Sequence, residues 1–152
     1  MSRTQKIIIG VVVAVLLGLF VIGALVGVAV SGWKSAVRSG NEAAALQNLK
    51  TIAAVEVQYF NSHNRTFGTF EQLAKEQMSD RRFSANPPNV DGYVFILKVI
   101  PKTTSQPSSY TLNADPESDR TGNNHFYLDS TEGSIRVNAD QPAGASDPPL
   151  NK

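Results

Sequence analysis

The most constraining feature of the sequence is an unbroken apolar run at residues 7–30, which contains no charged residue and no proline. An α-helix rises about 1.5 Å per residue, so a helix of this length would measure about 36 Å. The hydrocarbon core of a bilayer is about 30 Å thick, and the run therefore predicts a helix that crosses a membrane with some tilt. The apolar core of a secretion signal is only about 7–15 residues long, so we expect this run to be kept as an anchor.

The next stretch, residues 31–63, predicts that the helix continues beyond the membrane. It contains no proline and is rich in helix formers. At about 100° per residue its apolar side chains gather on one face, which predicts an amphipathic helix with a covering domain on that side. The residues of this face are Ala45, Leu46, Leu49, Ile52, Ala53, Val57 and Phe60.

Four later segments carry the signals of β-strands, either as a run of β-formers or as alternating apolar and polar positions. They are residues 93–100, 109–114, 125–129 and 134–138. Their connections are short enough to join neighbouring antiparallel strands. Before them, Thr69 and Gln72 have the spacing of a capping box, which predicts a short helix from residue 70 to about residue 77. Residues 79–91 have the composition of a loop and turn.

The predicted fold class is therefore α+β. A long N-terminal helix, membrane-spanning in its first half and amphipathic in its second, packs against a four-stranded antiparallel meander, because each element must bury its apolar face on another. The predicted parts are a short tail at residues 1–6, a transmembrane helix at 7–30, its amphipathic extension at 31–63, a linker and sheet at 64–140, and a tail at 141–152. We expect this tail to be loosely ordered, with contact between residues 148–150 and the sheet as an alternative.

Composition limits the function. The formal net charge is +1, and no basic stripe interleaved with aromatic residues predicts binding to nucleic acid. The chain has no cysteine, which excludes disulfides, thiolate metal sites and cysteine nucleophiles. The motifs of phosphate-binding loops, zinc proteases and serine hydrolases are also missing, so we expect no enzymatic activity and no small-molecule substrate.

Several short segments have a distinctive local sequence: residues 41–43, 49–52 and 55–59 in the helix, and residues 92–93, 110–115 and 133–136 in the strands. These segments resemble those of type IV pilins and of the pseudopilins of type II secretion. The resemblance implies a pilin-like fold, a single-pass anchor in the bacterial inner membrane and a domain on the extracytoplasmic side. It also implies a structural role in assembly, as a minor or accessory component of a type IV pilus or a type II secretion system.

The N-terminus departs from that family. Pilins have a short basic leader that ends in Gly, and the apolar helix that follows carries a Glu near its start. Here the best-aligned glycine is Gly10, inside the apolar run, and Ala14 stands where the Glu would fall. A pilin-like domain on a permanent anchor fits these residues better than a processed filament subunit.

Small residues recur at intervals of four in two series, the second of which ends just beyond the apolar run. Such positions let two helices approach closely in lipid, so they predict a packing surface for self-association or for a protein partner. The alternative is that glycine is simply common in membrane helices. The positions are Gly10, Ala14, Gly18, Gly23, Gly27 and Ser31.

Three residues just beyond the apolar run predict the position of the membrane interface. Trp33 has the character of an aromatic-belt residue, and the cationic side chains of Lys34 and Arg38 are expected to face lipid headgroups.

Glu56 falls within the apolar face of the amphipathic stretch. A buried carboxylate needs a partner, which predicts a structural role in which Glu56 bonds to the backbone or to a Lys or Arg and fixes the helix against the fold. We expect no catalytic role, because no second acid is placed with it.

The loop at residues 115–124 carries oxygen-bearing side chains at alternate positions. The candidate ligands are Asp115, Glu117, Asp119 and Asn123. Ca²⁺ prefers such ligands, and the resemblance to pseudopilins, some of which hold calcium in a loop of the sheet domain, points the same way. The alternative is a solvated turn rich in Asp and Asn. Apart from this ion we expect no cofactor.

A second functional hypothesis is a free-standing, membrane-anchored extracytoplasmic binding module with no role in a filament. Its ligand would contact the loops at residues 101–108 and 115–124, because loops on a rigid scaffold usually carry recognition.

Overall fold

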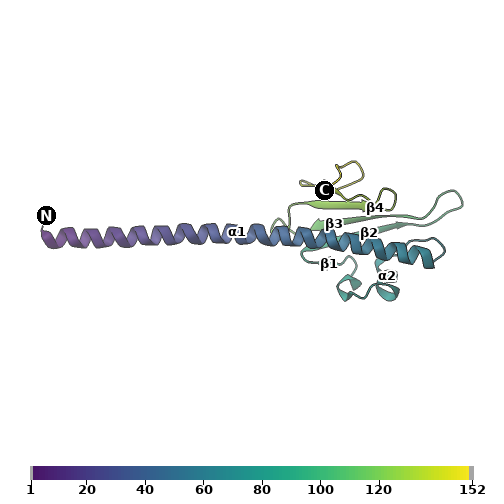
Figure 1. The fold of residues 1–152 in the computed structure, drawn as a ribbon, viewed down its shortest axis with the longest axis horizontal. Coiled ribbons are helices and arrows are strands. Elements are labelled where there is room, and N and C mark those ends of the chain that lie inside the picture. The colour runs from purple at the N-terminus through teal and green to yellow at the C-terminus, as the bar shows by residue number, and fades with distance from the viewer. Residues whose placement is uncertain (1, 151–152) are drawn as a thin grey trace. The chain divides into compact units, whose positions relative to one another are not determined.

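The structure, a computed structural model, describes residues 2–150, without the side chains of Lys6, residues 24–29 and Ser31. The chain forms two compact units, Met1–Val37 and Arg38–Lys152. One uninterrupted helix, α1 (Arg3–Ser62), contributes to both of them (Figure 1). The predicted continuation of the apolar helix into the following stretch is therefore confirmed.

The first unit is formed by α1, and its apolar side chains are exposed. The segment Arg3–Gly23 is long and apolar enough, by length and composition, to cross a membrane, and none of it is buried. Phe20, for example, is 77% exposed. An apolar surface of this extent is rare on a protein that is surrounded by water.

The second unit contains a five-stranded antiparallel sheet in the order β1-β2-β3-β4-β5. The strands are β1 (Asn89–Val90), β2 (Tyr93–Ile100), β3 (Ser109–Pro116), β4 (His125–Asp129) and β5 (Arg136–Asn138). The short helix α2 (Phe70–Glu76) and the 3₁₀ helix η1 (Arg81–Ser84) connect α1 to the sheet. The fold class is therefore α+β, as predicted, with consecutive strands paired as a meander.

The prediction of four strands was wrong, because the sheet gains the two-residue strand β1 at its edge. Asp91 and Gly92 both have positive φ angles, 53° and 76°. Two adjacent left-handed residues suit a tight hairpin, which folds β1 back onto β2. A strand of two residues is too short to show an alternating pattern, so the sequence revealed only the turn.

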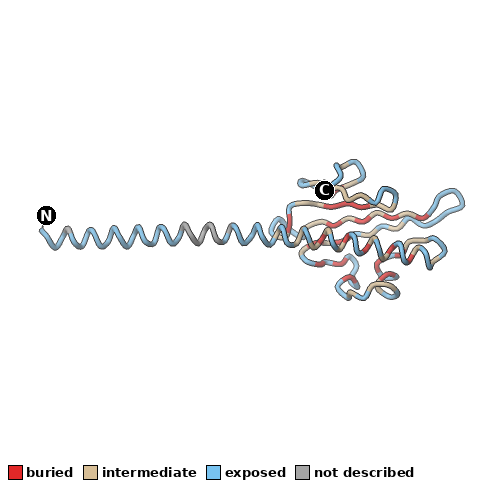
Figure 2. Tube along the Cα trace, in the orientation of Figure 1, coloured by how far each residue is buried: buried red, intermediate tan, exposed pale blue. Residues whose placement is uncertain are grey.

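The core of the second unit lies between α1 and the sheet. Ala45, Leu49 and Ile52 of α1 are completely buried, at the spacing that places them on one helix face (Figure 2). They belong to one cluster with side chains from four strands: Val90, Tyr93, Phe95, Tyr110, Leu112, Ala114 and Phe126. Truncation of a buried Leu in such a core typically costs about 2–5 kcal/mol, so this contact dominates the stability of the unit.

The face of α1 that meets the sheet is narrower than the sequence predicted. Glu56 and Tyr59 lie on it and are buried, whereas Val57 is 55% exposed. Ala53 and Phe60 are only half-buried. These three belong to a neighbouring row of the helix, and the sheet does not cover that row completely.

Helix α2 begins at the predicted capping box. The Thr69 hydroxyl accepts a hydrogen bond from the Gln72 backbone N–H, and the Gln72 side chain accepts one from the Thr69 N–H at 2.8 Å. Two otherwise unsatisfied donors are thereby paired, which stabilises the start of the helix. Phe70 of α2 is buried and stacks on Phe83 of η1, so the two short helices close one end of the core.

The final segment is more ordered than its composition predicted. The Asn113 amide donates to the Ala143 carbonyl at 2.7 Å, and the Asn138 amide donates to the Asp147 carboxylate at 2.9 Å. The backbone N–H of Leu150 donates to the Ile135 carbonyl, also at 2.7 Å. Side-chain and backbone hydrogen bonds therefore hold residues 143–150 beside β3 and β5, and residues 148–150 have the contact with the sheet that the sequence allowed.

We predict that Gly122→Ala destabilises the second unit by about 1–3 kcal/mol, the usual cost of overpacking. A Cβ atom at Gly122 would lie 2.1 Å from the Oη of the buried Tyr93, which itself donates to the Asn124 carbonyl. Thermal unfolding followed by near-UV circular dichroism, which reports on the core tyrosines, measures the loss. Gly144→Ala is the control, because a Cβ there meets no heavy atom within 4 Å. Equal melting temperatures of the two variants would contradict the packing described here.

Candidate functional site

The apolar part of α1 offers an open surface at the predicted small positions. A Cβ atom built at Gly10, Gly18 or Gly23 would meet no heavy atom within 4 Å outside the local helix backbone. Ala14 is exposed on the same helix. Gly27 and Ser31 were predicted as further members of this surface, but their side-chain environment lies outside the described residues. Within the described part of the chain, the small positions are therefore free to meet a second helix.

The three residues predicted to mark the membrane interface have different environments. Trp33 is 73% exposed and Lys34 is exposed, which leaves both side chains free for an interface. Arg38 is half-buried in the second unit, where its guanidinium donates a hydrogen bond to the Asn123 side-chain carbonyl at 3.3 Å. Arg38 thus contacts the sheet unit, a role that its basic character did not reveal.

The loop between β3 and β4 is fastened to α1 by side chains that the sequence did not single out. Glu42 accepts hydrogen bonds from the Asn123 backbone N–H at 2.9 Å and from the Asn124 side-chain amide at 2.8 Å. One residue earlier, the Asn41 amide donates to the Thr121 carbonyl at 2.9 Å. The only sequence signal for the attachment of this loop to α1 was that two polar residues, Asn41 and Glu42, precede the apolar face that begins at Ala45.

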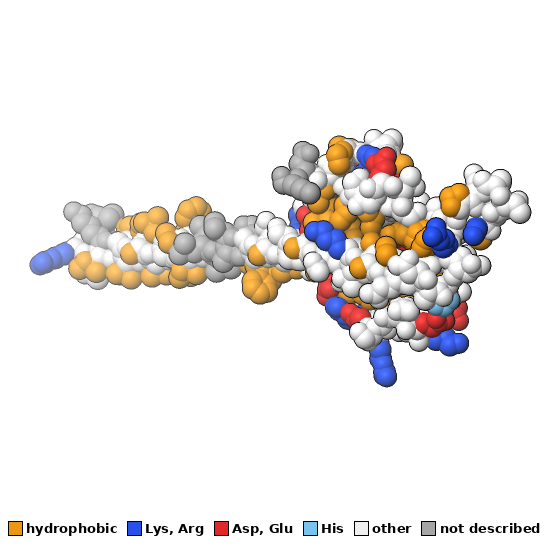
Figure 3. Space-filling view, turned by 45° about the vertical axis from the view of Figure 1, so that its right-hand side comes forward, with side chains coloured by type: hydrophobic (Ala, Val, Ile, Leu, Met, Phe, Trp, Pro, Cys, Tyr) orange, Lys and Arg blue, Asp and Glu red, His pale blue; other side chains and the backbone are white. Residues whose placement is uncertain are grey.

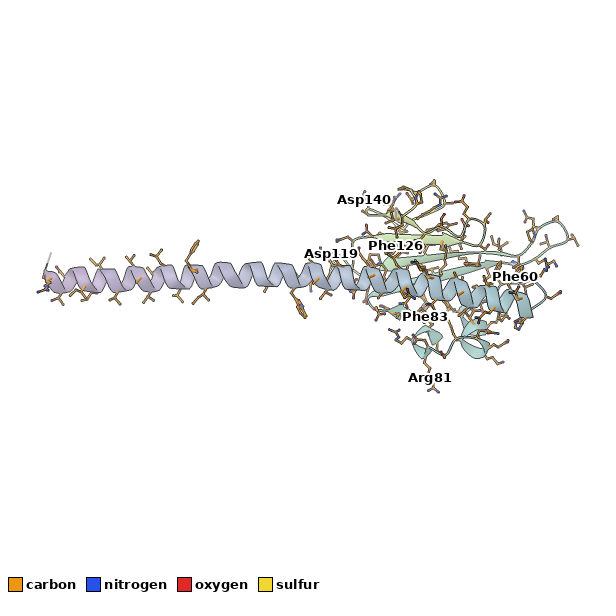
Figure 4. The ribbon with its side chains drawn as sticks, viewed as in Figure 1. Phe60, Arg81, Phe83, Asp119, Phe126 and Asp140 are labelled. Atoms are coloured by element: carbon orange, nitrogen blue, oxygen red, sulfur yellow. The ribbon has the colours of Figure 1, made fainter. Side chains whose placement is uncertain are left out.

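Of the four predicted calcium ligands, Asp119 and Asn123 line one shallow hollow, and Asp115 is bonded to His125 of the same hollow. The carboxylate of Asp115 accepts from the His125 imidazole at 2.6 Å, and Asn123 contacts Arg38. Asp119, labelled in Figure 4, lines a shallow hollow of about 270 Å³ together with His125. Glu117 is placed by its backbone N–H, which donates to the Gly92 carbonyl at 2.9 Å.

Among the residues that the structure describes, no three His, Cys, Asp or Glu side chains are grouped so that they could hold a metal ion. The Ca²⁺ site therefore remains a prediction from the sequence, and the observed hydrogen bonds already use two of its four proposed ligands.

Glu56 is the buried polar residue that links α1 to the segment before α2. Its side chain is fully buried, and its Oε2 accepts a hydrogen bond from the Gly68 backbone N–H at 2.9 Å. Its second oxygen, Oε1, has no partner among the described residues. The sequence predicted a backbone group or a Lys or Arg side chain as the partner of Glu56, and the structure has a backbone group.

Burial controls the charge of Glu56. Removal from water raises the pKa of its carboxyl from 4.5 to about 7, and the Gly68 N–H only partly opposes this rise. The same carboxylate affects Tyr110. Burial, the larger cause, and the negative charge of the nearby Glu56 together raise the pKa of the Tyr110 hydroxyl to about 12. The α1–Gly68 junction therefore changes its charge close to neutral pH.

A second contact closes the same end of α1. The imidazole of His63 stacks on the Tyr59 ring with a centroid distance of 3.7 Å, and its Nε2 lies 2.8 Å from the Glu76 carboxylate of α2. The end of α1 is thus joined to α2 as well as to Gly68.

The chemistry of the described contacts is mainly that of attachment, since carboxylates and amides of α1 bind backbone groups of the loops around it. No protein-family model, no curated protein and no solved structure matches the chain.

We predict that Glu56→Gln weakens the pH dependence of stability. The folded-state pKa lies above the unfolded value of about 4.5, so the folded state binds more protons between these two pH values. The wild type should therefore lose roughly 2–3 kcal/mol of unfolding free energy between pH 5 and pH 8.5, a loss that the variant avoids while keeping an acceptor for Gly68. Chemical unfolding at the two pH values measures it.

Glu71→Gln is the matched control for this experiment, because Glu71 lies exposed on α2. It removes the same charge and should retain the pH dependence of the wild type. Parallel stability curves for the wild type and Glu56→Gln would rule out the assigned role of Glu56.

Proposed function

We propose that this chain is a non-enzymatic, single-pass membrane protein with a pilin-like domain on the extracytoplasmic side of a bacterial inner membrane. One observation carries the proposal: the same helix, α1, has an exposed apolar part at Arg3–Gly23 and a later part whose buried face belongs to the core of the sheet unit. A helix with both properties couples a membrane anchor directly to a folded domain.

The mechanism that we propose is association through the anchor. In lipid the hydrophobic effect does not drive helices together, so close packing at small residues supplies the attraction. Gly10, Ala14 and Gly18 lie within about 80° of one another around the helix at 100° per residue, and they form one such surface. Gly23 begins a second surface on another side of the helix.

Within this proposal, the chain acts as a minor or accessory component of a type IV pilus or of a type II secretion system. Gly10 lies inside the apolar run, and Ala14 stands where the Glu of pilins would fall. Because a major filament subunit uses that Gly for processing and that Glu for assembly, these two residues favour an accessory role.

A free-standing binding module is the second candidate. It is favoured by the loop between β2 and β3, in which residues 101–107 are all exposed. The other loop considered for this role, residues 115–124, is less available because Glu42 and Asn41 bind it to α1.

We predict that a cysteine at Ala14 forms disulfide-linked dimers in membranes, whereas a cysteine at Val12 does not. The native chain has no cysteine, so each variant carries a single reactive thiol. Val12 lies about 160° around the helix from the centre of the small-residue surface. Mild oxidation of membranes that contain the full chain, followed by non-reducing electrophoresis, measures the dimer fraction.

Gly18→Leu provides the second test in the Ala14→Cys background. Its side chain has open space within one chain and would separate two chains packed at this surface, so we expect the dimer band to fall at least about fivefold. Equal cross-linking from Ala14 and Val12, unchanged by Gly18→Leu, would refute association through this surface.

A further inference from the structure

Two hollows of the second unit lie along the row of α1 that the sheet leaves partly open. The first has a volume of about 370 Å³ and is lined by Lys50 and Ala53 of α1, by Leu128 of β4, and by Ile135 and Leu150.

The second hollow has a volume of about 500 Å³. It begins one helical turn further on, at Val57, and includes Phe60 and Phe67 on one side and Ser130 on the other. Hydrophobic side chains are visible over the sheet unit in Figure 3, and Figure 4 labels Phe60 near the end of α1. Both hollows thus have α1 as one wall. The opposite wall is β4 and the turn after it in the first hollow, and that turn together with residues 107–109 in the second.

The width of the sheet explains why this groove exists. Five strands spaced about 4.8 Å apart span roughly 19 Å, whereas a helix with its side chains is about 10 Å wide. The buried residues of α1 share one core cluster with side chains of β1, β2, β3 and, of β4, with Phe126, but Leu128 of β4 is not part of that cluster. Leu128 and Ile135, from β4 and the turn before β5, therefore face the space beside the helix.

The charge around the groove indicates what could occupy it. Among the residues that the structure describes, Lys50 is the only charged one that lines the first hollow, and none lines the second. Lys50 is exposed and lies at one end of the row, while Phe60 lies about 15 Å further along the helix. Small-molecule sites typically combine an apolar lining with one or a few polar groups that fix orientation, and they have volumes of about 300–1,000 Å³.

We propose that this groove binds a single-chain anionic amphiphile, such as a fatty acid, with the carboxylate on the Lys50 ammonium and the acyl chain along Ala53 and Val57. The charge pattern is complementary to such a ligand: one cation at one end, followed by an uncharged apolar trough. A partner helix would bring several charged side chains, for which the lining offers a single counter-charge. This binding site goes beyond the proposed role in assembly and does not depend on it.

Photoaffinity labelling tests the proposal on the full chain in lipid nanodiscs. The probe is dodecanoic acid with a diazirine near the end of its chain, and mass spectrometry locates the label. We expect labelled peptides from α1 around Ala53–Phe60 and from the segment around Leu128–Ile135. Competition with free dodecanoate and free octanoate tests the acyl chain, because each additional methylene should strengthen displacement of the probe about fourfold. Dodecylamine, which carries a positive charge, should not displace the probe.

Two variants test the head and the chain of the ligand separately. Lys50→Glu should reduce labelling of the groove at least about fivefold. Lys98→Glu makes the same charge change at an exposed position of β2 and should have no effect. Ala53→Trp, which fills the trough, should also reduce labelling. Unchanged near-UV circular dichroism shows that each variant keeps its fold.

Several results would overturn the proposal. They are label found only in the anchor segment Arg3–Gly23, equal displacement by dodecanoate and dodecylamine, and equal labelling of Lys50→Glu and Lys98→Glu. Adducts that join two chains through the groove would also overturn it, because the occupant would then be a second copy of the protein. None of these results affects the cross-linking expected at Ala14.

Discussion

The sheet unit depends on the burial of one face of α1. Ala45, Leu49 and Ile52 are completely inaccessible, and the strands on the other side of the core are anchored on them. Glu56 extends this face with a carboxyl group that costs free energy to bury and is compensated by only one hydrogen bond, from Gly68. The contact therefore combines a large apolar gain with one polar group that specifies how the segment after α1 must lie. Without that face, the sheet would lose the only long helix that covers it in the described part of the chain.

Much of the fold was predictable from periodic patterns. The length of the apolar run, the continuous helix and the capping box at Thr69 follow from local rules, and the structure has all three. The strand at Asn89–Val90 was missed because two residues cannot display a period. The width of the buried helix face was overestimated for a different reason: periodicity defines which side chains point the same way, but the neighbouring strands decide how many of them are covered, as the exposure of Val57 shows.

The contacts at the candidate sites were less predictable. Glu56 stood out because a charge on an apolar face is anomalous, but Glu42 and Asn41 did not, since polar residues at a helix start have many possible partners. Their partners lie about 80 residues away in sequence. The spacing of oxygen ligands in the loop at residues 115–124 was compatible with a cation, yet spacing alone does not say that Asp115 instead faces His125. Long-range pairings of this kind depend on the register of the strands, which one sequence does not fix.

The attachments at the two ends of the buried part of α1 have a mechanical consequence. Glu42 holds Asn123 and Asn124, and Glu56 holds Gly68, about 21 Å further along the helix. A tension applied through the N-terminal part of α1 would load both attachments, and the apolar contacts between them, in shear along the helix axis. Shear requires many contacts to fail together, whereas peeling breaks them one at a time. A pull along the axis of α1 would therefore be resisted by both attachments and the apolar core at once.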